Sequence, residues 1–174
     1  MDTKKVYLCG PITTDEYSWK WREEVATALD YLFAIQALDP MRGKNLATIS
    51  DGGLKSNIPG RIFMNRDLMD LRDSSLVLCN FLSIPDRQCV GSLMELGYAL
   101  ALNIPFVVVT NEDFLKLHPF ISENALYVFD NIEDAIECCG FILVGASPSF
   151  KVPFKEEWKK LHKRDTVRYK TITE

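Results

Sequence analysis

Residues 75–81 read Ser-Leu-Val-Leu-Cys-Asn-Phe, a run that is apolar at almost every position. Strands that are buried on both faces of a parallel sheet show this continuous pattern instead of alternating apolar and polar residues. A helical pattern at 62–71 precedes the run, and another at 90–102 follows it. The segment therefore predicts the central strand of an α/β fold.

The same alternation of apolar runs and helical patterns extends along most of the chain. The predicted strands are 6–9, 33–38, 75–81, 106–109 and 126–129. The predicted helices are 16–32, 62–71, one that carries Glu95 and follows a turn at Gly91 and Ser92, and 131–139. Five such units predict a doubly wound parallel sheet with helices on both faces. In the strand order 2-1-3-4-5, the loops after the first and third strands meet at the point where ligands bind.

Two segments carry more detailed expectations. The helix at 62–71 is expected to bury Ile62, Phe63 and Met69, with Arg66, Asp67 and Asp70 among its polar positions. Residues 41–60 contain four glycines and show little periodicity, which predicts a long loop with a functional role.

Length and charge predict one domain with a basic extension. The 174 residues have a net charge of −4, but residues 147–174 hold eight Lys/Arg and four Asp/Glu, so the remainder is −8. We therefore expect a domain at 1–145 and an extension at 146–174 containing a short basic helix at 155–163. An acidic body disfavours nucleic-acid binding, and no apolar stretch has the length of a membrane span or a signal peptide.

The five cysteines are an odd number without metal-ligand spacing, which favours reduced thiols in a cytoplasmic protein. Cys9, Cys79, Cys138 and Cys139 lie in apolar surroundings and are expected to fill the core. The chain has no Walker loop, no Gly-x-Gly-x-x-Gly and no candidate Ser-His-Asp triad. We therefore expect neither a metal nor another cofactor.

Glu95 is the one charged residue between Val90 and Leu102. A carboxylate in apolar surroundings must be paired, protonated or functional. Because Gly91 and Ser92 resemble a strand-to-helix turn, Glu95 is expected in the first helical turn, beside the ligand-binding edge of the sheet. The alternative is a capping box, in which Ser92 is the N-cap and Glu95 the third helical residue.

Several segments resemble the nucleoside 2-deoxyribosyltransferase family, in the same order and at similar spacing over about residues 4 to 140. They are Tyr7-Leu8-Cys9-Gly10-Pro11, Asn65-Arg66-Asp67-Leu68, the strand 75–81 and Gly91-Ser92-Leu93-Met94-Glu95-Leu96-Gly97-Tyr98-Ala99. The resemblance implies a flavodoxin-like fold and a site that includes Gly10, Pro11, Ile12, Gly91 and Ser92.

The resemblance also implies roles for three side chains. Glu95 is the nucleophile that attacks C1′ of a deoxynucleoside, Tyr7 orients it, and Asp67 protonates the departing base. A second free base then takes the sugar. The residues alone also allow Tyr7 to be a core aromatic and Asp67 to pair with Arg66 or Arg72 on the surface. Trp19 and Trp21 lie either on the base side or in the core.

Three positions bear on the substrate. Transferases of this family usually carry an aspartate where this chain has Cys89, and that aspartate disfavours a 5′-phosphate. Arg42 is a candidate for contacting a base carbonyl or a phosphate. His118 corresponds to a segment that completes a neighbouring subunit's site in related enzymes, so a homo-oligomer with shared sites is expected, although a lone loop histidine is also often a plain surface residue.

Other functions remain open on the sequence alone. A 2′-deoxynucleoside 5′-monophosphate N-hydrolase fits Cys89, although Asp15 and Glu16 would oppose a phosphate. A non-catalytic nucleotide-binding module predicts binding without base release. Cleavage of NAD is a further alternative. It needs a site large enough for a dinucleotide, and no feature of the sequence indicates one.

Overall fold

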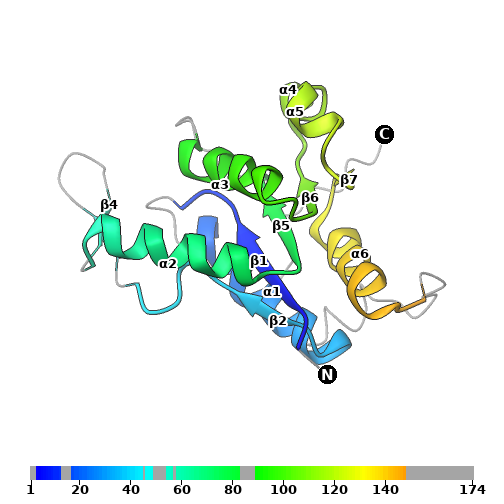
Figure 1. The fold of residues 1–174 in the computed structure, drawn as a ribbon, viewed down its shortest axis with the longest axis horizontal. Coiled ribbons are helices and arrows are strands. Elements are labelled where there is room, and N and C mark those ends of the chain that lie inside the picture. Colours follow the sequence, from blue (N-terminus) through cyan, green and yellow to red (C-terminus); the bar gives the residue numbers. More distant parts are fainter. Residues whose placement is uncertain are drawn as a thin grey trace.

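The main sheet consists of five parallel strands, which are β1 (Lys5–Cys9), β2 (Gln36–Leu38), β5 (Leu76–Asn80), β6 (Phe106–Val109) and β7 (Tyr127–Phe129). The computed structural model describes residues 3–12, 17–44, 46–48, 54–56, 58–82 and 89–147. The strand order β2-β1-β5-β6-β7 is the predicted order 2-1-3-4-5 (Figure 1). The predicted flavodoxin-like α/β class is therefore confirmed.

Helices cover both faces of this sheet (Figure 1). α1 (Tyr17–Phe33) and α6 (Ile132–Val144) pack on one face, and α2 (Gly60–Asp73) and α3 (Val90–Ala101) pack on the other. Because side chains alternate along a strand, β1 sends Val6 and Leu8 into the α1/α6 core. It sends Tyr7 and Cys9 into the core beneath α2 and α3, and these two residues reach the elements that carry Asp67 and Glu95.

The boundary between the first helix and the second strand differs from the prediction of a strand at 33–38. α1 continues to Phe33, and Ala34 follows it with a left-handed φ of 53°. The amides of Ala34 and Ile35 then bond back to the carbonyls of Asp30 and Leu29, at 2.9 and 3.2 Å. This pattern ends a helix and turns the chain, so that β2 begins only at Gln36.

Two predicted loops contain short regular elements. Within residues 41–60, β3 (Leu46–Thr48) and β4 (Leu54–Ser56) form a separate antiparallel pair. Between β6 and β7 lie the one-turn helices α4 (Asp113–Lys116) and α5 (Pro119–Ser122). Elements of three or four residues are too short to produce a readable hydrophobic period.

The buried face of α2 differs from the prediction. Ile62 and Met69 are 61% and 65% exposed, whereas Asp67 is 8% exposed and Leu71 is fully buried. Phe63 is half-buried. The spacing of apolar residues predicted the wrong inner face, because α2 places polar residues toward β1 and α3. Ion pairs to Asp67 compensate the cost of burying its charge.

α6 ends next to the predicted domain boundary. Its C-cap is Gly145, whose left-handed φ of 66° suits a residue without a side chain. Residues 148–174, including the predicted helix 155–163, lie outside the described residues, so the division at 145 stays a prediction. No helix in the described part of the chain is long and apolar enough to cross a membrane.

Candidate active site

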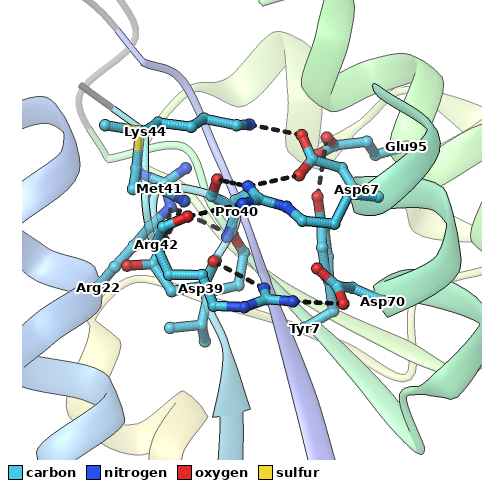
Figure 2. A network of polar contacts seen from close by, with 12 residues as sticks. Tyr7, Arg22, Asp39, Pro40, Met41, Arg42, Lys44, Asp67, Asp70 and Glu95 are labelled. Atoms are coloured by element: carbon cyan, nitrogen blue, oxygen red, sulfur yellow. Dashed lines mark hydrogen bonds and ion pairs between the residues drawn. The ribbon is translucent and has the colours of Figure 1, made fainter. Parts of the chain in front are cut away.

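Three polar side chains from three elements meet beside the carboxyl end of β1. Tyr7 comes from β1, Asp67 from α2 and Glu95 from α3. The Tyr7 hydroxyl donates a hydrogen bond of 3.0 Å to Glu95 Oε1, and Figure 2 shows the Asp67 carboxylate next to this pair. We call these three residues the Tyr7–Asp67–Glu95 cluster. Sequence reasoning named all three, and the fold brings them together.

The surroundings of Glu95 make its charged form less favourable than it is for a carboxyl group in water. Burial raises the pKa of Glu95 above its ordinary value, and the charge of Asp67 raises it further. Hydrogen bonds from Cys9 and Tyr7 oppose that shift. Burial, followed by the Glu95 charge, raises the pKa of Tyr7 far above its ordinary range, so Tyr7 keeps its proton and serves as a donor. Glu95 is therefore a weakly hydrated carboxylate held in one orientation.

Two thiols anchor the start of α3 to the sheet. Cys9 and Cys79 are neighbours on β1 and β5, with their Sγ atoms 3.3 Å apart. The Cys9 thiol also donates to the Ser92 carbonyl at 3.5 Å, and the Ser92 side chain is buried. Since Ser92 lies one helical turn before Glu95, this contact helps to place Glu95 above Tyr7.

α3 starts earlier than predicted. It begins at Val90 with Cys89 as the N-cap, and the Leu93 amide bonds to the Cys89 carbonyl at 3.0 Å. Ser92 is therefore the third helical residue, and Glu95 lies in the second turn. The first-turn placement of Glu95 and the capping-box alternative are both wrong, because Gly91 is part of the helix and does not form a turn before it.

Asp67 is held by two cations. Lys44 Nζ lies 2.6 Å from Asp67 Oδ2, and an Arg66 guanidinium nitrogen lies 3.2 Å from Asp67 Oδ1. Pairing with Arg66 was one of the sequence alternatives, but it was expected on the surface, whereas Asp67 is buried. Sequence reasoning missed Lys44 because its loop has no periodicity from which to infer its direction.

The loop after β2 is fastened to α2 by further polar contacts (Figure 2). The Arg66 guanidinium donates to the carbonyls of Pro40 and Arg42, at 2.6 and 2.7 Å. Arg42 binds Asp70 at 2.6 Å, and this contact raises the pKa of Arg42. Arg42 was predicted to contact the substrate. In this structure its guanidinium binds Asp70 and takes part in none of the contacts given above for the side chains of Tyr7, Asp67 and Glu95.

Arg22 is a fully buried charge that sequence reasoning also missed. Its guanidinium donates to the carbonyls of Leu8 and Gly10, at 3.2 and 2.6 Å, and lies 3.7 Å from Asp39 Oδ1. Burial lowers the pKa of Arg22, and the charge of Asp39 opposes the shift. Its position on the helix could have revealed this burial. Arg22 lies three residues before the buried Val25 and therefore on the same core-facing side of α1.

Arg22 supports the chain where β1 ends. At Gly10, a Cβ atom would lie only 2.7 Å from the Asn80 carbonyl oxygen of β5, so glycine permits this close approach. Pro11 is buried and Ile12 is half-buried directly after it. Trp21 is buried on α1, which favours the core alternative for that residue. The side chain of Trp19 lies outside the described residues, as do Asp15, Glu16 and residues 83–88.

The remaining predicted site residues lie at helix starts. Cys89 is half-buried at the N-cap of α3, where burial raises its pKa, and the next residues of that helix include the exposed Gly91. His118 is exposed on the crossover between β6 and β7. Its Nδ1 accepts the Phe120 amide at 3.3 Å as the N-cap of α5. Within one chain, His118 makes none of the contacts given above for the cluster.

The described residues contain no group of three or more His, Cys, Asp or Glu side chains that could hold a metal ion. The cluster instead offers one carboxylate that accepts a hydrogen bond from Tyr7 and a second carboxylate that is held by cations. Most enzymes that cleave glycosidic bonds use a pair of carboxyl groups, one as the nucleophile and the other to assist the leaving group.

Comparisons with known proteins show the family and the fold of the chain. A sequence model of the nucleoside 2-deoxyribosyltransferase family matches residues 6–140. No curated protein matches the chain significantly. Among solved structures, a conserved protein from Enterococcus faecalis V583 superposes with a TM-score of 0.57 at 19% identity, covering 78% of this chain and 96% of that one.

Two further solved structures have the same fold. One is a 2-deoxyribosyltransferase from Bacillus psychrosaccharolyticus, with a TM-score of 0.56 at 16% identity, covering 76% of this chain and 90% of that one. The other is a CMP N-glycosidase from Clostridium botulinum, with a TM-score of 0.54 at 12% identity, covering 80% of this chain and 100% of that one. At such identities the likeness concerns the fold alone.

Proposed function

Because the chain belongs to the nucleoside 2-deoxyribosyltransferase family, we propose that it cleaves the N-glycosidic bond of 2′-deoxynucleosides and transfers the sugar to a second nucleobase. The observation that carries this proposal is the hydrogen bond from Tyr7 to Glu95, inside the segment that matches the family. It holds a half-buried carboxylate in one orientation, which is what attack on a sugar carbon requires.

The proposed reaction has two halves. Glu95 attacks C1′, so that an ester bond to the sugar forms as the bond between C1′ and the base nitrogen breaks. Asp67, when protonated, gives its proton to the departing base. In the second half, a nitrogen of another base attacks C1′, its proton passes to Asp67, and the Glu95 carboxylate is released. Water in place of the second base turns the transfer into hydrolysis.

Burial gives Glu95 its reactivity in this scheme. A carboxylate with little hydration is a stronger nucleophile than one in water, because less solvent must be removed before attack. The raised pKa of Glu95 predicts that base release falls as acid protonates the nucleophile, at a higher pH than for an ordinary carboxyl. Gly10, Pro11, Ile12, Gly91 and Ser92 are proposed to line the sugar side.

The second candidate function is hydrolysis of 2′-deoxynucleoside 5′-monophosphates. The observation that favours it is the start of α3, where, among the described residues, the N-cap Cys89 makes no side-chain cap hydrogen bond. A helix start of this kind suits an anion, and Cys89 lacks the charge with which an aspartate would repel a phosphate. The fold likeness to a CMP N-glycosidase is compatible with this alternative.

A chromatographic assay tests the proposed function. The protein is incubated with the four common 2′-deoxynucleosides and, separately, with their 5′-monophosphates, each with and without adenine or cytosine as second base. We expect base release, with a new deoxynucleoside appearing only when the second base is present. Release of base and sugar phosphate from monophosphates alone would favour the second candidate, and no release from any substrate would overturn both.

Cys89→Asp tests whether position 89 recognises the 5′ end of the substrate. We expect the variant to keep or improve turnover of deoxynucleosides, because a carboxylate there accepts a hydrogen bond from the 5′-hydroxyl. It should depress any turnover of 5′-monophosphates by about tenfold or more, because two anions would face each other. The readout is kcat/KM for thymidine and thymidine 5′-monophosphate, with Cys89→Asn as the uncharged control.

An equal effect of Cys89→Asp and Cys89→Asn on both substrates would contradict this prediction. Position 89 would then act through the start of α3 and not through recognition of the 5′ end.

We expect the protein to be a homo-oligomer in which His118 of one subunit completes the site of another. Phe114, Leu117 and Phe120, which flank His118 in the chain, are exposed, and so are Met94 and Tyr98 on α3. Exposed apolar side chains in such numbers are typical of an interface. Light scattering at the assay concentration measures the mass, and an active monomer would contradict the prediction.

A further inference from the structure

Two free thiols lie in contact beneath α3, the helix that carries Glu95. Cys9 on β1 and Cys79 on β5 are register partners in the sheet. The Cys79 thiol donates to the sulfur of Cys9, and the two Sγ atoms are 3.3 Å apart. Both side chains are fully buried, in the same core as Tyr7. A pair of thiols therefore lies directly next to the residues that hold the proposed nucleophile.

The geometry of the sheet allows these two thiols to join. Neighbouring strands are about 4.8 Å apart, and disulfides connect residues whose Cα atoms are about 4.4–6.8 Å apart. Because Cys9 and Cys79 are direct partners, their backbones already have this separation. The sulfur atoms need to approach each other by about 1.3 Å to reach a bonded distance. A disulfide can therefore form without any change of strand order or register.

The hydrogen of the Cys9 thiol serves α3. It donates to the Ser92 carbonyl at 3.5 Å, one helical turn before Glu95. Burial raises the pKa of Glu95, and hydrogen bonding by Cys9 opposes that shift. A disulfide carries no thiol hydrogen, and its formation draws the Cys9 sulfur toward Cys79. Oxidation of Cys9 therefore ends the contacts through which β1 holds the start of α3 and supports the charge of Glu95.

The start of α3 is the side from which an oxidant reaches the pair. Cys89 is the half-buried N-cap there, and it lies close enough to Cys79 for an electrostatic interaction. Burial, and then the Cys79 thiol, raises the pKa of Cys9, so Cys9 keeps its proton while it is covered. Reaction with a peroxide requires a thiolate, which forms when local opening of the first turn of α3 admits water.

We propose that Cys9 and Cys79 are a redox modification site, at which a peroxide joins the two thiols and thereby stops base release reversibly. Two S–H bonds and the O–O bond of the peroxide break, one S–S bond forms, and two water molecules leave when the oxidant is hydrogen peroxide. The two sulfur atoms are oxidised and the peroxide oxygens are reduced. Formation of the disulfide rests on the geometry of the pair, whereas its effect on base release rests on the proposed function.

The first part of the test is chemical. The full-length protein is treated with hydrogen peroxide, the excess is removed with catalase, and the remaining thiols are blocked. Mass spectrometry of an unreduced digest should then show the peptides of Cys9 and Cys79 linked, with the mass of two hydrogen atoms lost, and dithiothreitol should separate them. The inference is wrong if peroxide adds oxygen atoms to Cys89, or links other cysteines, without linking Cys9 to Cys79.

The second part measures base release before peroxide treatment, after it, and after dithiothreitol. We expect kcat to fall by about tenfold or more with a smaller change in KM, because misplacing a catalytic group by about 1 Å can cost about 10²-fold in rate. Dithiothreitol should restore kcat. Cys79→Ala should keep its own starting activity through the same treatment, because Cys9 then has no partner. Cys138→Ala on α6 is the matched control and should be inactivated like the parent.

The outcomes separate this inference from the proposed function. If Cys9 and Cys79 join but base release is unchanged, the inference is wrong and the function stands. The inference is also wrong if Cys89→Asn prevents the inactivation and Cys79→Ala does not, because Cys89 is then the sensitive thiol. If the untreated parent releases no base from any deoxynucleoside or monophosphate, the function fails and its proposed regulation fails with it, while the digest still shows whether the two thiols join.

Discussion

Glu95→Gln is expected to reduce base release by a factor on the order of 10⁴ or more, because an amide cannot form the ester to C1′. Glutamine has nearly the same shape, and its amide oxygen can still accept the hydrogen bond from Tyr7. The measurement is single-turnover release of base by chromatography, with parent and variant at equal concentration. A Glu95→Gln protein with a wild-type rate would show that another group attacks the sugar.

The same substitution should leave stability unchanged or raise it. Burial raises the pKa of Glu95 above its value in the unfolded chain, so its contribution to stability is present at acid pH and is lost as pH rises through the folded-state pKa. Glutamine stays neutral at every pH. Urea unfolding at pH 7 should therefore give a midpoint at or above that of the parent, which separates loss of chemistry from loss of fold.

Tyr7→Phe is the matched control for that experiment. It removes the donor at 3.0 Å but keeps the ring that packs beneath α2 and α3. Because this hydrogen bond lowers the pKa of Glu95, we expect the acid limb of kcat/KM to move to higher pH in the variant. Activity should survive, since the nucleophile itself is intact. An unmoved acid limb would mean that Tyr7 serves packing alone.

The fold was predictable because its strands are apolar on both faces. Runs such as 75–81 and 106–109 have no polar alternation, which is typical of strands in a parallel sheet that is covered on both faces. The ends of the helices were harder to predict, because they depend on backbone dihedral angles that the amino-acid composition does not determine. Ala34 ends α1 in a left-handed conformation that a non-glycine residue rarely adopts, and Gly91 lies within α3.

The site was predictable only in part, for an electrostatic reason. Tyr7, Asp67 and Glu95 belong to segments with a recognisable pattern, and the fold brings these segments together. Lys44 and Arg22 are charged residues that the structure buries, and general patterns place such residues in solvent. Their burial follows from partners far away in the sequence, which a reading of local period cannot detect.

Arg22 carries the largest expected effect on stability. Its side chain is fully buried, and removing it would leave two carbonyls and the Asp39 carboxylate without their cation. Breaking a buried charge pair on one side costs about 3–5 kcal/mol. We therefore expect Arg22→Ala to lower the free energy of unfolding by about that amount, and Arg22→Lys to lower it less, because lysine keeps the charge but loses the forked geometry.

The effect of Arg22 should also reach the candidate active site. Arg22 binds the carbonyls of Leu8 and Gly10, which lie one and three residues after Tyr7 in the chain. A looser end of β1 would weaken the hold of Tyr7 on Glu95, so Arg22→Lys should lower kcat more than it raises KM. The measurements are urea unfolding and steady-state kinetics on the same preparations.

Arg72→Ala is the control for Arg22, since Arg72 is exposed on α2 and its removal should change stability by no more than about 0.5 kcal/mol. If Arg22→Ala unfolded at the urea midpoint of Arg72→Ala, water would be replacing the guanidinium at the carbonyls of Leu8 and Gly10. That site would then be open to solvent, and the end of β1 would not depend on a buried charge for its position.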